Sequence, residues 1–236
     1  MMSELEPLKQ LLFTCKLENI KLAEQLAKGL KFNLKKWLAE EGFGQIGVKK
    51  PQDLATVFNN GKDLEVFKPP RQHTITNVRA FLHFPSLKSL ELNDQDIRDL
   101  LPFTQLPNLK VLYLGGNGLT NAHLDAFKDF NQLEELYLWG NKLDSIHNLA
   151  HLTNLQALTF NNNQIKDISP IVSLQKLTYL VGSTNEITDI SPLAGVANNS
   201  FRRIEFNYNP LSKEQVDLFK TLFKGKEESC ISSLEV

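Results

Sequence analysis

A phrase of eleven residues recurs six times in the C-terminal part of the chain. Its pattern is L-x-x-L-x-L-x-x-N-x-L, with successive starts 22 or 24 residues apart, at Leu87, Leu109, Leu133, Leu155, Leu177 and Phe201. Within L-x-L, both leucines lie on one face of a short strand and the intervening residue lies on the other. One turn cannot bury its leucines alone, so turns must stack. The repeat therefore predicts a stack of similar turns whose strands form a sheet.

The phrase resembles the repeat of the leucine-rich repeat family over about residues 87–211. The segments KDISPIVSL (166–174) and TDISPLAGV (188–196) match each other and resemble the 22-residue repeats of bacterial internalins. Repeats of the same length occur in the leucine-rich regulatory subunit of a eukaryotic protein phosphatase. The resemblance implies a right-handed α/β solenoid with a parallel sheet on its concave face. Pro170 and Pro192 suit the first position of a short 3₁₀ turn.

The ninth residue of the phrase is asparagine in every copy except the first. These asparagines are Asn117, Asn141, Asn163, Asn185 and Asn209. The resemblance implies a buried ladder in which each side-chain amide bonds the backbone of its own turn and of the adjacent turn. We therefore expect them to be structural. Gln95 replaces the asparagine in the first copy and Gly182 replaces an apolar residue in the fifth, and both departures are expected to weaken the repeat.

Open ends of a stack expose apolar surface, so terminal caps are expected. Residues 1–63 predict a helical cap or subdomain, and residues 64–211 hold one degenerate and six recognisable repeats. Residues 212–236 predict a capping helix and a tail, with Ser212 and Gln215 forming a capping box at the start of that helix.

Composition excludes two classes of partner. The 26 Lys and Arg residues against 27 Asp and Glu residues leave no basic excess for binding nucleic acid. No apolar run approaches the roughly 18 residues of a membrane span, and the N-terminus lacks the pattern of a secretory leader. We expect a cytoplasmic protein, with export by a specialised system left open. The isolated Cys15 and Cys230 are expected to be reduced thiols.

Two motifs suggest chemistry only weakly. GFGQIG (42–47) has phosphate-loop spacing, but a helical segment precedes it and Pro51 follows closely, which favours a loop that ends a helix. His147 and His151 have the spacing of two zinc ligands, but Asn148 stands where a metalloprotease has glutamate. We expect no catalytic residue, no cofactor and no metal ion.

The outward residues of the predicted strands are more informative. All four tyrosines and one of the two tryptophans fall on or beside the concave sheet, which the phenylalanines mostly avoid. Tyrosine and tryptophan are enriched in protein interfaces, although cross-strand tyrosine pairs also stabilise sheets. The predicted centre of a protein-binding surface comprises Tyr113, Tyr137, Trp139 and Tyr179. Its predicted rim comprises Glu135, Asn161, Arg203 and Tyr208.

These features predict a monomeric, non-catalytic module that binds a protein partner through a rigid concave surface. One alternative is a bacterial secreted or delivered effector, or a surface protein, that binds a host protein. Another is an enzyme whose activity lies in the N-terminal region. Repeat scaffolds bind many different partners, so the fold does not name this one.

Overall fold

The computed structural model describes residues 12, 17–29, 33–40, 48, 50–53, 65–68, 75 and 78–224. The chain forms two compact units, Met1–Leu109 and Lys110–Val236. This division does not decide the segment boundaries expected at residues 63 and 211, which stay predictions. The motif at 42–47, Cys15 and Cys230 lie outside the described residues.

The second unit is a stack of turns, each contributing one short strand. The strands are β3 (Val111–Tyr113), β4 (Glu135–Tyr137), β5 (Ala157–Thr159), β6 (Tyr179–Val181) and β7 (Arg203–Glu205). They pair in parallel and in chain order, so equivalent residues of successive repeats lie side by side. The middle residue of each strand, such as Leu136 or Leu158, is fully buried. The predicted parallel sheet is therefore confirmed, and its strands pair with equivalent repeat positions in register.

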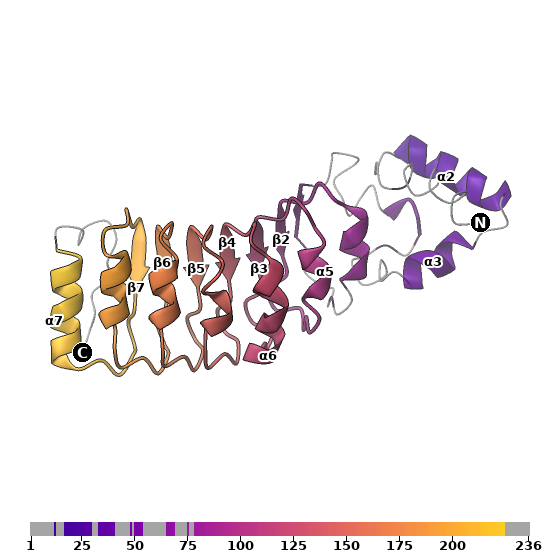
Figure 1. Cartoon of the computed structure of the whole chain (residues 1–236). Coiled ribbons are helices and arrows are strands. Elements are labelled where there is room, and N and C mark those ends of the chain that lie inside the picture. The colour runs from indigo at the N-terminus through magenta and orange to yellow at the C-terminus, as the bar shows by residue number, and fades with distance from the viewer. Residues whose placement is uncertain are drawn as a thin grey trace. The chain divides into compact units, whose positions relative to one another are not determined.

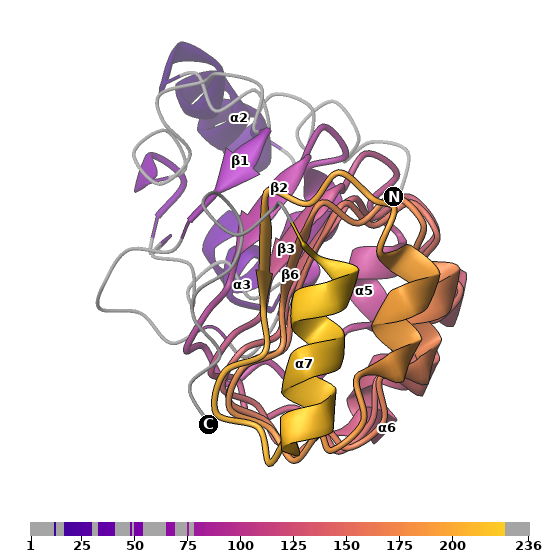
Figure 2. The same ribbon diagram turned by 90° about the vertical axis from the view of Figure 1, so that its left-hand side faces the viewer.

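Short helices return the chain from one strand to the next. They are α6 (Asn121–Leu124), η4 (Asp125–Asp129), η5 (His147–Leu149), η6 (Ser169–Ser173) and η7 (Ser191–Val196). Figure 2 shows the strands of this unit along one side of the stack and these helices along the other. The leucines and isoleucines of both limbs meet between the two sides and form a continuous core.

The D-I-S-P phrase explains the local geometry of η6 and η7. Asp167 accepts hydrogen bonds from the backbone N–H and the hydroxyl of Ser169, at 2.7 and 2.9 Å. Asp189 makes the same pair of bonds with Ser191. Each aspartate thereby satisfies a donor that a helix start leaves unpaired. The following proline lies within the first two positions of each 3₁₀ helix, as its fixed φ predicts.

The helix α7 (Lys213–Leu222) follows the last repeat and caps the C-terminal end of the stack, as Figure 1 shows. The Ser212 hydroxyl accepts a bond from the Gln215 backbone N–H at 3.4 Å, so half of the expected capping box is present. The Gln215 side chain instead accepts a bond from the Ile190 backbone N–H at 2.8 Å. Gln215 therefore ties the cap to η7, where the buried Val216 and Phe219 also close the core.

The first unit contains helices followed by the beginning of the repeat pattern. Its described elements are α2 (Leu17–Gly29), α3 (Leu34–Glu40), β1 (Val66–Phe67), η3 (Arg79–His83), β2 (Ser89–Glu91) and α5 (Leu101–Thr104). β1 pairs in parallel with β2, and the buried Phe67 packs on Phe81 at a ring distance of 4.9 Å. Trp37 of α3 contacts His83 of η3 edge-on at 5.5 Å. Within the described ranges, no helix is both long and apolar enough to cross a bilayer.

Candidate protein-binding surface

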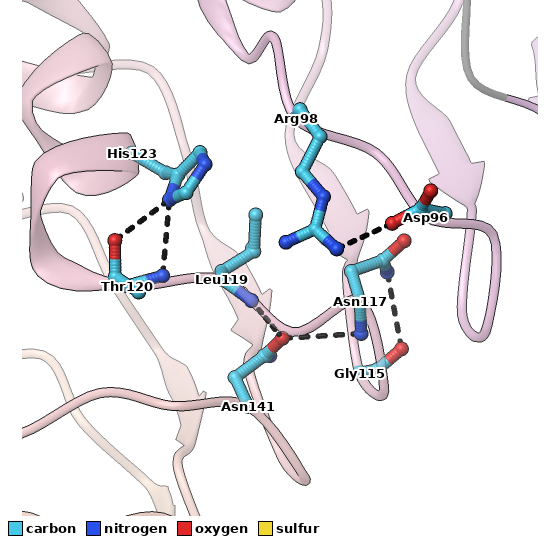
Figure 3. A network of polar contacts seen from close by, with 8 residues as sticks. All are labelled: Asp96, Arg98, Gly115, Asn117, Leu119, Thr120, His123 and Asn141. Atoms are coloured by element: carbon cyan, nitrogen blue, oxygen red, sulfur yellow. Dashed lines mark hydrogen bonds and ion pairs between the residues drawn. The ribbon is translucent and has the colours of Figure 1, made fainter.

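The repeat asparagines form hydrogen bonds that run backwards along the stack. The Asn141 Oδ1 atom accepts the backbone N–H groups of Asn117 and Leu119, at 3.1 and 3.0 Å (Figure 3). Its Nδ2 donates to Leu114 of the preceding turn and to Leu138 of its own turn. A similar arrangement, with one preceding-turn donor and carbonyl acceptors in two turns, is formed by Asn163, Asn185 and Asn209. Asn117 donates to the Gly115 carbonyl of its own turn. From Asn141 onward, the amide groups of these side chains therefore hold the backbone of adjacent turns together.

The two departures from the repeat are compensated structurally. In the first unit, the Gln95 Oε1 accepts the backbone N–H of Ile75 at 3.0 Å and its Nε2 donates to the Asn93 carbonyl. At Gly182, the missing leucine side chain leaves space that the rings of Phe160 and Phe206 occupy, as close as 2.6 Å to where a Cβ would stand. Both departures are thus accompanied by compensating contacts, and whether the repeat is weaker there stays a prediction.

One structural rule of the repeat is not visible in the spacing of its leucines and asparagines. The residue immediately before the ladder position has a left-handed backbone, with φ between 55° and 66°, in all six copies: Asp94, Gly116, Gly140, Asn162, Thr184 and Tyr208. Glycine, asparagine and aspartate tolerate this region. A β-branched or aromatic residue there is strained, and such strain often marks functional positions. The side chain of Tyr208 is also 75% exposed.

The open face is the side of the β3–β7 sheet that points away from the core. Its residues are the first and third of each strand, together with the residue two positions beyond the third. At one end, Tyr113 and Tyr137 stack face to face, with ring centres 4.2 Å apart and planes 7° apart. The Tyr137 hydroxyl donates to the Glu135 carboxylate at 2.7 Å. Burial and the bond to Glu135 strongly raise the pKa of Tyr137, so the phenol stays protonated and remains a donor.

Trp139 lies flat against the neighbouring repeat. A Cβ placed on Gly115 would stand only 2.1 Å from the Trp139 Cε2 atom, so the indole occupies the space over that glycine. The tryptophan side chain is thus half-buried and its position depends on a neighbour without a side chain. Tyr113, Tyr137, Glu135 and Trp139 together are named the aromatic cluster below.

Small side chains follow the aromatic cluster on β5. Ala157 and Thr159 are only 6% and 5% exposed, although both lie on the open face. The Thr159 hydroxyl oxygen is buried and has no hydrogen-bond partner, and the same holds for the Ser183 hydroxyl. Buried polar groups without partners are few in folded proteins. We name Ala157 and Thr159 the β5 strip.

A second aromatic group lies on the far side of the β5 strip. The Arg203 guanidinium carbon lies 5.7 Å from the centre of the Tyr179 ring, within the range of a cation–π interaction. Arg203 also pairs with Glu205 at 2.8 Å. This bond is the main cause that raises the pKa of Arg203. Tyr179 is therefore held between a cation on β7 and the β5 strip.

The predicted centre of the binding surface forms two groups, one on each side of the β5 strip. Tyr113, Tyr137 and Trp139 belong to the first group, and Tyr179 belongs to the second. Of the predicted rim, Asn161 is half-buried beyond the β5 strip, whereas Tyr208 projects from the turn after β7. Whether these residues bind a partner stays a prediction.

The paired histidines have a structural environment. His151 Nε2 lies 2.8 Å from the Phe127 carbonyl oxygen, and His147 lies in the short helix η5. Among the residues that the structure describes, no three histidine, cysteine or acidic side chains gather as a metal site.

Comparison with known proteins agrees with this architecture. Residues 85–143 and 153–195 match two family models of leucine-rich repeats. The pattern, the stacked turns and these matches show that the chain contains leucine-rich repeats of the internalin-like kind, which form an α/β solenoid fold. No curated protein matches the sequence at a significant level.

Three solved structures show how far the likeness extends. Internalin C2 of Listeria monocytogenes is 28% identical, with a TM-score of 0.53 over 75% of this chain and 85% of that one. A second Listeria monocytogenes internalin is 19% identical, with a TM-score of 0.53 over 75% of this chain and 58% of that one. A leucine-rich repeat protein of Leptospira interrogans is 24% identical, with a TM-score of 0.54 over 68% of this chain and 40% of that one. The last two likenesses concern the fold alone.

Proposed function

We propose that this chain is a non-catalytic module that binds a protein partner through the open face of its repeat sheet. The observation that carries this proposal is the segregation of aromatic residues. Tyr113, Tyr137, Trp139 and Tyr179 line the open face, whereas most of the described phenylalanines fill the core. Proteins of the leucine-rich repeat class typically act as protein-interaction modules, which supports the same conclusion.

The geometry of the open face favours binding with little loss of entropy. Tyr137 is held by stacking and by its bond to Glu135, Trp139 is held against Gly115, and Tyr179 is held by Arg203. Ordering a mobile side chain at an interface costs about 0.5–1.5 kcal/mol. Side chains that are already fixed in the free protein avoid most of this cost, so a partner gains more from each contact.

Site-specific photo-crosslinking in a lysate of the native host tests the proposal. One variant carries a benzophenone amino acid in place of Tyr179, on the open face. A matched variant carries it in place of Val172, which is 44% exposed on η6 at the opposite side of the stack. We expect a discrete protein adduct from the Tyr179 position only. Adducts of the same protein from both positions, or from Val172 alone, would contradict the proposal.

We further propose a bacterial origin for the chain, which the likeness to internalin C2 over 85% of that protein favours. The sequence leads us to propose a cytoplasmic location, with delivery to a host protein as the competing hypothesis. Immunoblots of washed cells and of culture supernatant, with a cytosolic enzyme as the lysis control, separate the two. Enrichment of the chain in the supernatant over the control would reject the cytoplasmic location.

A further inference from the structure

We propose that the open face accepts an arginine side chain of its partner over the β5 strip, between Glu135 and Tyr179. The inference rests on the proposed function and adds the chemistry of the residue that the surface recognises. Three independent features of the open face support it: the arrangement of side chains across β4, β5 and β6, the charge of Glu135, and the unpartnered hydroxyl of Thr159.

The register of the strands sets the arrangement. Glu135 pairs with Ala157, and Ala157 pairs with Tyr179, so these three residues form one row across the sheet. Neighbouring strands lie about 4.8 Å apart, which separates the Glu135 and Tyr179 backbones by about 10 Å. Only the methyl group of Ala157 stands between them. Ala157 is only 6% exposed in the free protein, so a side chain that inserts over it must displace the groups that cover it. It then has a carboxylate on one side and an aromatic ring on the other.

The charge of the site is negative and lacks a balancing cation. Among the described residues, Glu135 forms no ion pair, and its hydrogen bond comes from the neutral phenol of Tyr137. The nearby carboxylates differ, because Glu134 pairs with Lys110 at 2.6 Å and Glu205 pairs with Arg203. A carboxylate accepts several hydrogen bonds, and the strongest come from charged donors. Glu135 therefore retains capacity for a cationic donor.

The shape of the site favours arginine over lysine. Arg203 already lies by Tyr179 on the β7 side, and on the β5 side the residue in register with Tyr179 is the small Ala157. A guanidinium is planar, so it can stack on a ring and direct its fork of N–H donors to a carboxylate at once. An ammonium lacks that plane. Arginine is also enriched in protein interfaces.

Thr159 provides the remaining partner in the same strip. Its hydroxyl oxygen is buried and has no hydrogen-bond partner, and the residue is 95% buried, being 5% exposed. Arginine carries five N–H donors, more than one carboxylate satisfies. A guanidinium that enters the β5 strip and displaces the side chains covering Thr159 supplies a donor that the free protein lacks at this position.

The four tyrosines provide a direct readout. In protein labelled with ¹³C in its tyrosine rings, three signals come from Tyr113, Tyr137 and Tyr179 on the open face, and one comes from Tyr208 beyond it. The probe is N-acetyl-arginine amide, with N-acetyl-citrulline amide as the uncharged analogue of the same shape. We expect saturable shifts of the Tyr137 and Tyr179 signals at millimolar arginine probe, and none of comparable size with citrulline. Equal shifts with both probes would overturn the inference.

Two glutamate variants of the same strand region sharpen the test. Glu135→Gln should weaken binding of the arginine probe about tenfold, since a hydrogen bond to a charged group is lost. Glu134→Gln, which removes an exposed carboxylate off the open face, should leave binding unchanged. Thermal unfolding of both variants checks that the fold is retained. Unaltered affinity in Glu135→Gln would refute the inference.

The outcome is separable from that of the proposed function. If Tyr179 crosslinks to a partner and Glu135→Gln leaves that adduct intact, the open face binds protein but not through an arginine at this strip. If no adduct forms while the arginine probe binds as expected, the chemistry of the strip stands without the module function.

Discussion

Restoring the family pattern at Gly182 should destabilise the protein. The repeat pattern usually has leucine at this position. Substitutions toward a family consensus commonly stabilise a protein by about 0.5–2 kcal/mol. The structure indicates the opposite sign, because the space is filled by two phenylalanine rings from the neighbouring repeats. A Cβ on residue 182 would stand 2.6 Å from Phe160 and 2.8 Å from Phe206.

The size of the effect follows from these contacts. An ordinary carbon contact begins near 3.4 Å, so each ring would have to move by about 0.6–0.8 Å in a closely packed core. Overpacking of this kind costs about 1–3 kcal/mol. Replacing glycine also stabilises the protein by about 0.4–1 kcal/mol, because the unfolded chain then has less conformational entropy to lose on folding. The expected net loss is therefore about 1 kcal/mol for Gly182→Ala and about 2 kcal/mol for Gly182→Leu.

Urea unfolding, followed by circular dichroism, measures these free energies. The matched rescue is the triple variant Gly182→Leu, Phe160→Leu and Phe206→Leu, which replaces the compensating rings with the repeat's usual leucines. This triple variant should recover most of the unfolding free energy that Gly182→Leu alone removes. Substitutions at residues in contact are not additive, so the leucines at 160 and 206 can offset the leucine at 182. A Gly182→Leu protein as stable as the parent, or more stable, would show that the core yields and would refute the reasoning.

Four further predictions concern single positions. Asn141→Ala should lower the free energy of urea unfolding by about 2–3 kcal/mol, since buried backbone groups of two turns lose their partners; a loss below half that size would contradict the ladder. Gly115→Ala should displace the Trp139 indole, shift its fluorescence to longer wavelength and cost about 1–2 kcal/mol, whereas an unchanged spectrum would disprove the contact. Tyr208→Asn should raise stability by about 1 kcal/mol because asparagine tolerates a left-handed backbone, and a less stable variant would argue against strain. Asp167 has a lowered pKa, mainly through the Ser169 backbone N–H, so its stabilisation is complete above pH ~4 and is lost as the pH falls through the lower folded value. The melting temperature of Asp167→Asn should therefore depend less on pH in this acidic range, which parallel melts of both proteins would decide.

The repetitive part of the fold could be predicted from the sequence because the same physical problem recurs in each turn. The L-x-L spacing placed Leu136 and Leu158 in the core, and D-I-S-P placed Pro170 at a helix start. The outward positions of Tyr113 and Tyr137 followed from the same two-residue period.

Side-chain orientation and compensation between repeats could not be predicted in this way. Trp139 leans over Gly115 because the two share a column of adjacent repeats, and a large residue beside glycine in one column was the available signal. The left-handed position was also visible as a column of Gly, Asn and Asp. Thr184 and Tyr208 obscured it, because neither residue favours that backbone. The Gln215 side chain accepts the Ile190 N–H at 2.8 Å rather than closing its own capping box, because the stack places a backbone donor of the neighbouring turn within its reach.

The direction of the asparagine bonds implies an order in which the turns of the stack can be completed during synthesis. From Asn141 onward, each ladder Oδ1 accepts from the turn that precedes it, as Asn163 does from Leu143 and Asn209 does from Ile187. During synthesis the preceding turn always emerges first, so its amides must wait for an acceptor that is not yet made. The growing end is thus always one turn short of completion. When the last turn and α7 have been made, Gln215 accepts the Ile190 backbone N–H and the end of the stack no longer lacks an acceptor. In a nascent chain, the asparagine of each new turn therefore completes the backbone hydrogen bonds of the turn before it.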